Sequence, residues 1–259
     1  MSLVIAEKNC FFPDAFEYLT PREWDLAYEP FSLPGQVGLL TGWHIKPSPR
    51  ATAKNKVVLH LHGNAQNMSA HVAASYFLAL EGFHLITFDY RGYGLSQGRP
   101  TLRGIIDDGR TVVNHLLANP PLPGAPLGLF GQSMGAFTAA HLLPFFPGLD
   151  GAVLEAGLIS FRDLFLEAYP QAEVAIPEGL STLSPLSQGR VPKLFIHGTK
   201  DQIVPLSHSE RMFQAAAPPK RLLIIPGLGH IDGLDIPRAG EYRRAVVDFF
   251  THPDPATES

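Results

Sequence analysis

The sequence predicts an α/β protein whose central sheet is mostly parallel and carries helices on both faces. Short apolar runs alternate with amphipathic stretches along the chain, and this alternation is typical of repeated strand–helix units. A chain of 259 residues fits one such domain, and no feature divides it into two hydrophobic cores. We therefore expect residues 1–259 to form a single domain.

The first half of the chain is expected to hold an entry hairpin and two strand–helix units. Pro34 and Gly35 separate two β-like segments, 25–32 and 36–45, and predict the turn of the hairpin. In the units that follow, strands are expected at 56–61 and 83–90, and helices at 68–80, which Gly82 ends, and at 102–117.

The second half of the chain continues the alternation with one interruption. Strands are expected at 126–130, 151–155, 193–197 and 221–226, and helices at 134–143, 207–217 and 241–251. Residues 158–190 break the rhythm, because apolar side chains recur at helical spacing over 161–169 and three prolines interrupt the rest.

The most informative motif is Gly-x-Ser-x-Gly at residues 131–135, between a predicted strand and a predicted helix. A serine in such a turn takes a strained backbone conformation, and the two glycines remove Cβ atoms that would collide where strand and helix cross. The turn exposes the Ser133 hydroxyl and directs the first N–H groups of the helix to the same place. This arrangement is typical of a nucleophilic serine. The alternative is a Gly-rich turn that only needs to be tight.

A nucleophilic serine needs a base, and the base needs an acid that orients it. Asp201 follows the strand at 193–197, and His230 lies in a Gly-rich loop after the strand at 221–226. Loops that leave the same end of a parallel sheet lie at one edge, so we expect Ser133, Asp201 and His230 to meet there.

Two other acids bear on this assignment. Glu155 ends an earlier strand, and some hydrolases carry the acid there, so Glu155 is the alternative to Asp201. We prefer Asp201 because its loop matches the expected position better. Asp232 follows His230 closely and is expected to be a solvated loop acid.

Five segments in order resemble the α/β-hydrolase superfamily, specifically its small abhydrolase-domain serine hydrolases, a branch of esterases, lipases and peptidase-like proteins. The matching segments are His-Leu-His-Gly-Asn-Ala-Gln-Asn at 60–67, Asp-Tyr-Arg-Gly-Tyr-Gly-Leu-Ser at 89–96, the serine motif at 131–135, and residues 197–205 and 229–230. The resemblance implies the α/β-hydrolase fold with the triad Ser133, Asp201 and His230. It also implies that the backbone N–H groups of Asn64 and Met134 form the oxyanion hole.

The resemblance further implies that the connection after the sixth strand forms a cap over the active site. Residues 158–190 occupy this position, and about thirty residues make a small cap with a modest apolar pocket. Phe161, Phe165 and Tyr169 are expected to contact substrate, although the aromatic side chains of this segment could equally pack on the core.

These residues together predict a serine hydrolase of the carboxylesterase type that cleaves short-to-medium acyl esters through an acyl-enzyme. Peptidase, amidase, thioesterase or depalmitoylase activity on the same triad is the alternative, because fold and triad serve all of these reactions. A hydrolase-fold protein that only binds a ligand is a weaker alternative, since a binding module does not need a strained serine.

Composition excludes several other classes. A net charge of −4 without a basic stripe argues against nucleic-acid binding, and no apolar run reaches the roughly 18 residues of a membrane span. The single cysteine, Cys10, excludes an internal disulfide and a cysteine-based metal site. We expect no cofactor and a cytoplasmic protein. The start at Met1-Ser2-Leu3 is compatible with a vector-derived remnant, in which case a native leader is missing.

Other conspicuous polar residues are expected to be structural. His60 and His62 alternate on one strand, but no third ligand follows at the spacing of a metal site. Asp89 and Arg91 are expected to form an ion pair or to cap a turn, and the acids at 107–108 to lie on the solvent face or cap region of a helix.

Overall fold

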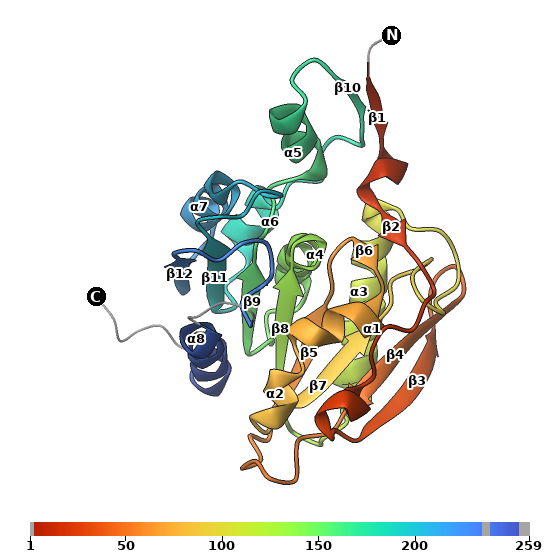
Figure 1. Ribbon diagram of the computed structural model, residues 1–259, viewed down its shortest axis with the longest axis vertical. Helices are drawn as coiled ribbons and strands as arrows, with labels where there is room; N and C mark the ends of the chain where they lie inside the picture. The colour runs from red at the N-terminus through yellow and green to blue at the C-terminus, as the bar shows by residue number, and fades with distance from the viewer. Residues whose placement is uncertain (1–2, 235–238, 254–259) are drawn as a thin grey trace.

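The computed structural model describes residues 3–234 and 239–253 and confirms the predicted α/β class (Figure 1). Met1 and Ser2, part of the vector remnant considered above, lie outside these residues. Within the described residues, eight strands form one sheet in the order β12-β11-β9-β8-β5-β7-β4-β3. The strands of this sheet are β3 Tyr28–Pro34, β4 Leu39–Ile45, β5 Val57–Leu61, β7 His84–Phe88, β8 Leu127–Gln132, β9 Gly151–Glu155, β11 Lys193–Gly198 and β12 Lys220–Ile225.

The entry hairpin is antiparallel and every strand after it is parallel. β3 and β4 pair from Tyr28↔Ile45 to Pro34↔Leu39, and β4 also runs antiparallel to β7. The pairs β5–β7, β5–β8, β8–β9, β9–β11 and β11–β12 are all parallel. The carboxyl ends of these six strands therefore share one edge of the sheet.

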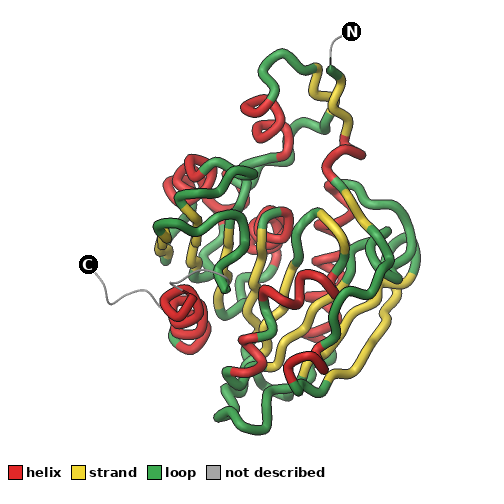
Figure 2. The backbone as a smooth tube through the Cα atoms, in the orientation of Figure 1, coloured by secondary structure: helices red, strands yellow, loops and turns green. Residues whose placement is uncertain are grey.

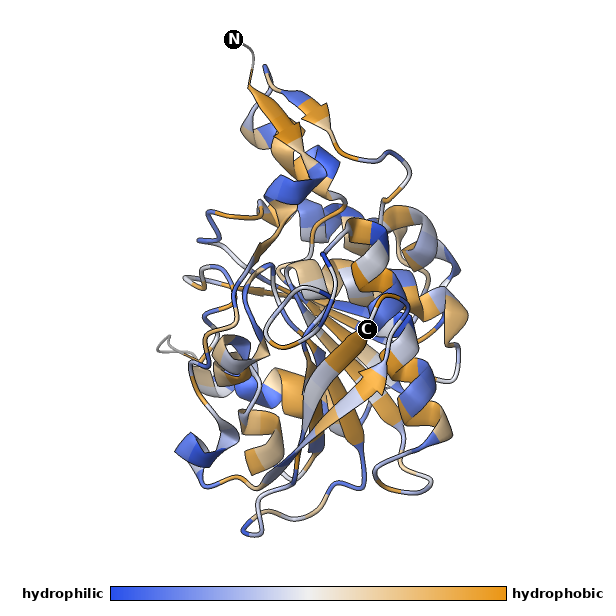
Figure 3. Ribbon diagram, turned by 90° about the vertical axis from the view of Figure 1, so that its right-hand side faces the viewer, coloured by the Kyte–Doolittle hydropathy of each residue, from blue (hydrophilic) through white to orange (hydrophobic). Residues whose placement is uncertain are grey.

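Helices cover both faces of the sheet (Figure 2). The helices are α1 Met68–His71, α2 Phe77–Leu80, α3 Leu102–Ala118, α4 Met134–Leu142, α5 Phe161–Ala168, α6 Leu183–Gln188, α7 Leu206–Ala215 and α8 Ala239–Thr251. Successive strand residues point to opposite faces of the sheet and pack in two hydrophobic cores. In β8, for example, Leu129 packs in the core under α3, α4, α6 and α7, and Phe130 packs in the core under α1, α2 and α8. In Figure 3 the strands between these helices are predominantly hydrophobic, as burial on both faces requires.

The helix predicted over 68–80 is interrupted. α1 ends at His71, a 3₁₀ turn follows over Val72–Ala74, and α2 begins only at Phe77. The Asn67 side chain caps α1 by accepting a hydrogen bond from Ser69 N at 2.9 Å. The sequence predicted one helix here and did not reveal the change in hydrogen-bond pattern along the segment.

The segment 158–190 contains α5, the short strand β10 (Glu173–Ala175) and α6. β10 pairs in parallel with β1 (Val4–Ala6), a contact between segments far apart in the sequence that local pattern did not predict. Figure 1 shows α5, β10 and β1 projecting together beyond the sheet. A second small pair joins β2 (Phe12–Pro13) to β6 (Ala65–Gln66).

The solvent-facing placement expected for Asp108 is wrong. Asp108 is fully buried, and its carboxylate accepts hydrogen bonds from Arg91 N, Nε and Nη2 at 2.7–3.0 Å. A buried carboxylate requires such a partner, and Arg91 follows β7 directly. Arg91 thus forms the ion pair expected for it with Asp108 of α3. This ion pair connects α3 to the loop after β7.

Candidate active site

Ser133 lies between β8 and α4 in the strained conformation that the motif predicted. Its φ of 55° and ψ of −114° fall in a region that non-glycine residues rarely adopt. The Ser133 N–H donates to Glu155 O at 2.9 Å, so β9 holds the turn in place. A Cβ on Gly131 would lie 2.4 Å from Gly135 O, and one on Gly135 would lie 1.7 Å from Leu61 O. Both glycines are therefore required by close backbone contacts.

Gly135→Ala should destabilise the protein by about 3 kcal/mol, because backbone surrounds the added methyl group and the turn cannot relax to admit it. This corresponds to a fall in Tm of roughly 6–12 °C for a domain of this size. Gly148→Ala is the matched control, since a Cβ there meets no atom within 4 Å. Thermal unfolding of both variants checks the prediction, and equal melting temperatures would contradict it.

Asp201 occupies the loop after β11 and is held from two sides. Its Oδ1 accepts hydrogen bonds from the backbone N–H groups of Ile203 and Val204 at 2.8 and 2.9 Å. Its Oδ2 lies 2.7 Å from His230 Nδ1 and 3.3 Å from His197 Nε2. Burial alone would raise the pKa of Asp201, but the hydrogen bonds from His197 and His230 outweigh it and hold this pKa well below its usual value. Asp201 is therefore ionised.

His230 occupies the loop after β12, which crosses closely over the end of β11. A Cβ on Gly198 would lie 2.1 Å from Leu228 O, and the N–H of Lys200 donates to the same carbonyl at 2.9 Å. Asp232 is not simply solvated, because its Oδ1 accepts from Gly229 N at 2.9 Å and closes the turn around His230. Gly198 is the last residue of the buried strand β11, and a glycine at that place is the sequence signal that could have revealed this crossing.

The three loops after β8, β11 and β12 leave the same edge of the parallel sheet, as predicted. The structure pairs Asp201 with His230, and it places Ser133 in the elbow after β8. The side chain of His230 is 18% exposed and Ser133 is 7% exposed, so both can be reached from solvent. The bond to Asp201 occupies Nδ1 and leaves Nε2 as the ring nitrogen that can receive a serine proton.

Of the two residues whose backbone N–H groups are expected to form the oxyanion hole, Met134 begins a helix and Asn64 is held in place by hydrogen bonds. Met134 is the first residue of α4, where a helix leaves N–H groups without intrahelical acceptors. Asn64 is anchored through its other groups: its carbonyl accepts from Phe12 N at 2.8 Å and from the Tyr93 hydroxyl at 2.9 Å, and its Nδ2 donates to Cys10 O at 3.1 Å. The oxyanion role of both amides stays a prediction.

Glu155 is placed differently from Asp201. It is fully buried at the end of β9, where its Oε2 accepts from Gln132 Nε2 at 2.6 Å and from the Tyr242 hydroxyl at 2.7 Å. Within the described residues its Oε1 has no hydrogen-bond partner. Burial raises the pKa of Glu155, and the bonds from Tyr242 and Gln132 only partly oppose this. No hydrogen bond between Glu155 and His230 is formed in the described structure.

A buried polar chain supports the residue directly before the nucleophile, and sequence analysis missed it. The Gln132 Oε1 lies 2.9 Å from His60 Nε2, and the His60 Nδ1 lies 3.1 Å from the Ser75 hydroxyl. Burial lowers the pKa of His60 to about 3, so the ring is neutral and donates to Gln132. Gln132 is thus fixed by His60 on one side and by Glu155 on the other.

His60 near the end of β5 and His62 just after it make hydrogen bonds within the protein. No group of three or more His, Cys, Asp or Glu side chains in the part of the chain that the structure describes could hold a metal ion. His62 Nδ1 donates to Gly63 O at 2.8 Å, and its Nε2 lies 3.5 Å from Asp89 Oδ1. Asp89 also accepts from Met68 N at 2.7 Å, in accord with the structural role expected for it.

The three aromatic residues expected to bind substrate differ in burial. Phe161 is 4% exposed and packs in the core, with its ring centroid 5.5 Å from that of Phe137 and 6.5 Å from that of Phe11. Phe165 is partly buried against the same core, and Tyr169 is 50% exposed beyond the end of α5. Core packing accounts for Phe161, and a substrate contact of any of the three stays a prediction.

A family model described as serine aminopeptidase, S33, matches residues 52–188, which is more than half of the chain. The chain belongs to this family. It is therefore a member of the α/β-hydrolase superfamily and a serine hydrolase, as the motifs predicted. The match covers the elbow and the segment at 60–67, but it ends before Asp201 and His230.

Relatives of this S33-family chain are known in bacteria and yeasts. It is 34% identical to the uncharacterized protein YfhR of Escherichia coli over 218 residues, which cover 81% of this chain and 75% of YfhR. It is 24% identical to the protein bem46 of Schizosaccharomyces pombe over 262 residues, covering 96% and 87% of the two chains. A relative in Saccharomyces cerevisiae, 29% identical over 206 residues covering 75% and 70%, is named an uncharacterized membrane protein.

Solved structures share the fold. An esterase of Pyrococcus furiosus superposes with a TM-score of 0.75 at 21% identity, covering 92% of this chain and 95% of the esterase. An α/β serine hydrolase without a lid from Xanthomonas campestris gives a TM-score of 0.66 at 21% identity, covering 89% and 97%. Among the described residues, none of the helices combines the length and apolar character needed to cross a membrane.

Proposed function

We propose that this protein is a carboxylesterase that cleaves esters of short-to-medium acyl chains through an acyl-enzyme on Ser133, Asp201 and His230. The observation that carries the proposal is the 2.7 Å contact between His230 Nδ1 and Asp201 Oδ2, made at the same sheet edge as the strained Ser133. Such a pair gives the imidazole a fixed tautomer and an oriented lone pair, which a binding protein would not need.

The reaction follows from this arrangement. His230 Nε2 takes the Ser133 proton while Oγ attacks the ester carbonyl, and Asp201 stabilises the imidazolium that forms. The N–H groups of Asn64 and Met134 receive the oxyanion, and removal of one such donor typically costs about 3–4 kcal/mol of transition-state stabilisation. The imidazolium then gives its proton to the departing alcohol. Water, deprotonated by the same nitrogen, attacks the acyl-enzyme, and the acid and free Ser133 are released.

The segment 158–190 acts as a short cap in this proposal. α5 follows β9 after a short loop; it carries Phe161 and Phe165, with Tyr169 just after its end, and Phe161 packs against Phe137 of the elbow helix α4. A separate cavity of about 220 Å³ borders the loop of His230 and is lined in part by His71, Ile231 and Tyr242. None of Ser133, Asp201 and His230 is among the described residues that line this cavity.

Turnover of nitrophenyl esters should peak at acyl chains of about two to six carbons. Each CH₂ that fits the pocket adds about 0.8 kcal/mol of burial, or roughly fourfold in the specificity constant per carbon. Beyond the end of the pocket a longer chain stays in water or displaces the cap, so the gain stops. kcat/KM measured across the acyl series checks this. A profile that still climbs at long chains would replace the proposal by a lipase or depalmitoylase-like activity.

Peptide or amide hydrolysis is the second candidate, because the matching family model is described as a serine aminopeptidase. The same triad serves both reactions, and the two candidates are separated by kcat/KM for an ester and an anilide with the same acyl group. An anilide turned over faster than the matched ester would favour the peptidase.

The proposed carboxylesterase reaction uses no cofactor, and we propose a cytoplasmic location for the protein.

A further inference from the structure

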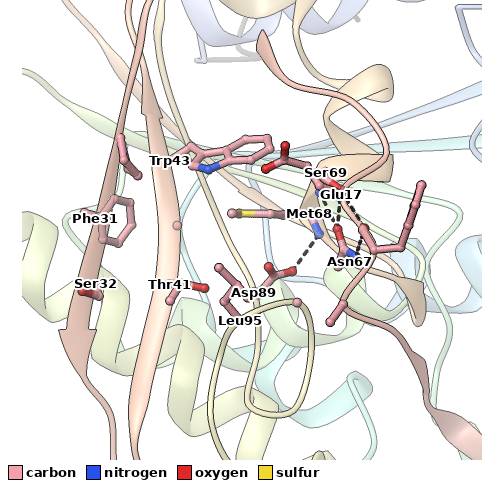
Figure 4. Close-up of a pocket in the computed structure, with 15 residues that line it drawn as sticks. Glu17, Phe31, Ser32, Thr41, Trp43, Asn67, Met68, Ser69, Asp89 and Leu95 are labelled. Carbon is pink, nitrogen blue, oxygen red and sulfur yellow. Dashed lines mark hydrogen bonds between the residues drawn. The ribbon is translucent and has the colours of Figure 1, made fainter.

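A groove of about 630 Å³ lies away from the elbow, and neither Ser133, Asp201 nor His230 lines it. It opens between the β3–β4 hairpin, the loop after β7, the start of α1 and residues 15–17 of the amino-terminal segment (Figure 4). In the sheet, β7 is separated from β8 by β5. The volume falls in the range of ordinary small-molecule sites. The proposed ester hydrolysis leaves this groove without a role.

The walls of the groove are largely aromatic and aliphatic. Phe31 of β3, Trp43 of β4 and Met68 of α1 face the same space in Figure 4. At the rim, Phe16 is 66% exposed and Leu95 is 77% exposed, although large apolar side chains are usually covered. A partner with an apolar surface would bury both of them.

The polar groups of the groove carry negative charge. Glu17 and Asp89 both line it, and no Lys, Arg or His is among the described residues that do so. Asp14 stands next to this edge, where its carboxylate accepts from Asn67 Nδ2 and from the Tyr18 hydroxyl, both neutral donors. The described residues that line the groove therefore carry two carboxylates and no basic side chain.

Asp89 is the deepest of these acids. It is 2% exposed, its Oδ1 accepts from Met68 N at 2.7 Å, and within the described residues its Oδ2 receives no hydrogen bond. His62 Nε2 stands 3.5 Å from Oδ1, and the same ring donates from Nδ1 to Gly63 O at 2.8 Å. Oδ2 is therefore the carboxylate oxygen that is left for a cationic group in the groove.

We propose that this groove binds a small organic cation, an ammonium group that carries an apolar body. The faces of Trp43 and Phe31 attract such a cation through their ring quadrupoles, while Asp89 and Glu17 supply the opposite charge. A metal ion fits poorly, because Ca²⁺ and Mg²⁺ need about six oxygen ligands and the walls are mainly carbon. An anion would meet two carboxylates and no basic side chain.

Isothermal titration calorimetry of the whole protein with choline tests the proposal. 3,3-Dimethyl-1-butanol is the neutral probe of the same shape, and it should bind at least tenfold more weakly than choline. Leu95→Lys places a positive charge on the exposed rim and should weaken choline binding at least tenfold. Glu17→Gln should weaken it about threefold to fivefold, because Glu17 is exposed to solvent.

Leu117→Lys is the matched control for the rim substitution. Leu117 is a half-exposed leucine of α3 that does not line the groove, so this variant should bind choline as the wild type does. Asp89 is left unchanged because it holds the start of α1. The proposal is overturned if choline gives no saturable heat, if the neutral probe binds equally well, or if the two lysine variants have the same affinity.

Discussion

Ser133→Ala should abolish ester turnover, by about 10⁶-fold in kcat, as removal of the nucleophile does in serine proteases. The reason is that the remaining groups can orient water and substrate but cannot form the acyl-enzyme. Fold and stability should be preserved, because the elbow is shaped by Gly131 and Gly135 and by the bond from the Ser133 N–H to Glu155 O, none of which uses the hydroxyl.

A fluorophosphonate probe provides the direct measurement. It should label the wild type once, at Ser133, and should not label Ser133→Ala. Ser187→Ala is a suitable control, because Ser187 is an exposed serine of α6 that bonds only within its own helix. Labelling or turnover that survives in Ser133→Ala would show that the elbow serine is not the nucleophile.

Asp201→Asn should lower kcat by about 10⁴-fold, and the structure gives a specific reason. Oδ1 accepts from the N–H groups of Ile203 and Val204, so the oxygen of the new amide must stay on that side. Its NH₂ group then faces His230 Nδ1 and acts as a donor. The imidazole can accept this bond only in the tautomer that carries its proton on Nε2, and that tautomer cannot deprotonate the serine.

Glu155→Gln is the matched variant for this experiment. Glu155 forms no hydrogen bond with His230 in the described structure, so we expect less than a tenfold loss of kcat from this change. Stability should fall, because an amide oxygen is a weaker acceptor than a carboxylate for the bonds from Gln132 and Tyr242, and the new NH₂ group takes the buried place of Oε1, which has no partner in the described structure. If Asp201→Asn stays near wild type and Glu155→Gln is inactive, the acid lies on the earlier strand.

The alternation of apolar runs determined the α/β class, because strands buried on both faces must be apolar throughout and their helices must be amphipathic. The sequence also located the elbow through the pattern Gly-x-Ser-x-Gly, although the structure shows that Gly131 is required by a contact within the turn and Gly135 by a contact with Leu61 O of β5. The local sequence pattern gave a wrong prediction of burial where a residue's surroundings come from segments far away in the sequence. Asp108 was expected at the surface, and it is buried because Arg91 of another element reaches it.

The sequence by itself determined the fold class, the family resemblance and the short set of polar residues that follow strands. Only the tertiary structure distinguishes the surroundings of Asp201 from those of Glu155, because both lie at the same sheet edge and differ in what packs around them; the role of Asp201 as the acid stays a prediction. The loop over Gly198 brings His230 to Asp201, whereas Gln132 and Tyr242 draw Glu155 into the core. Periodicity reports which side of an element is buried, but hydrogen-bond partners far apart in sequence are fixed by packing.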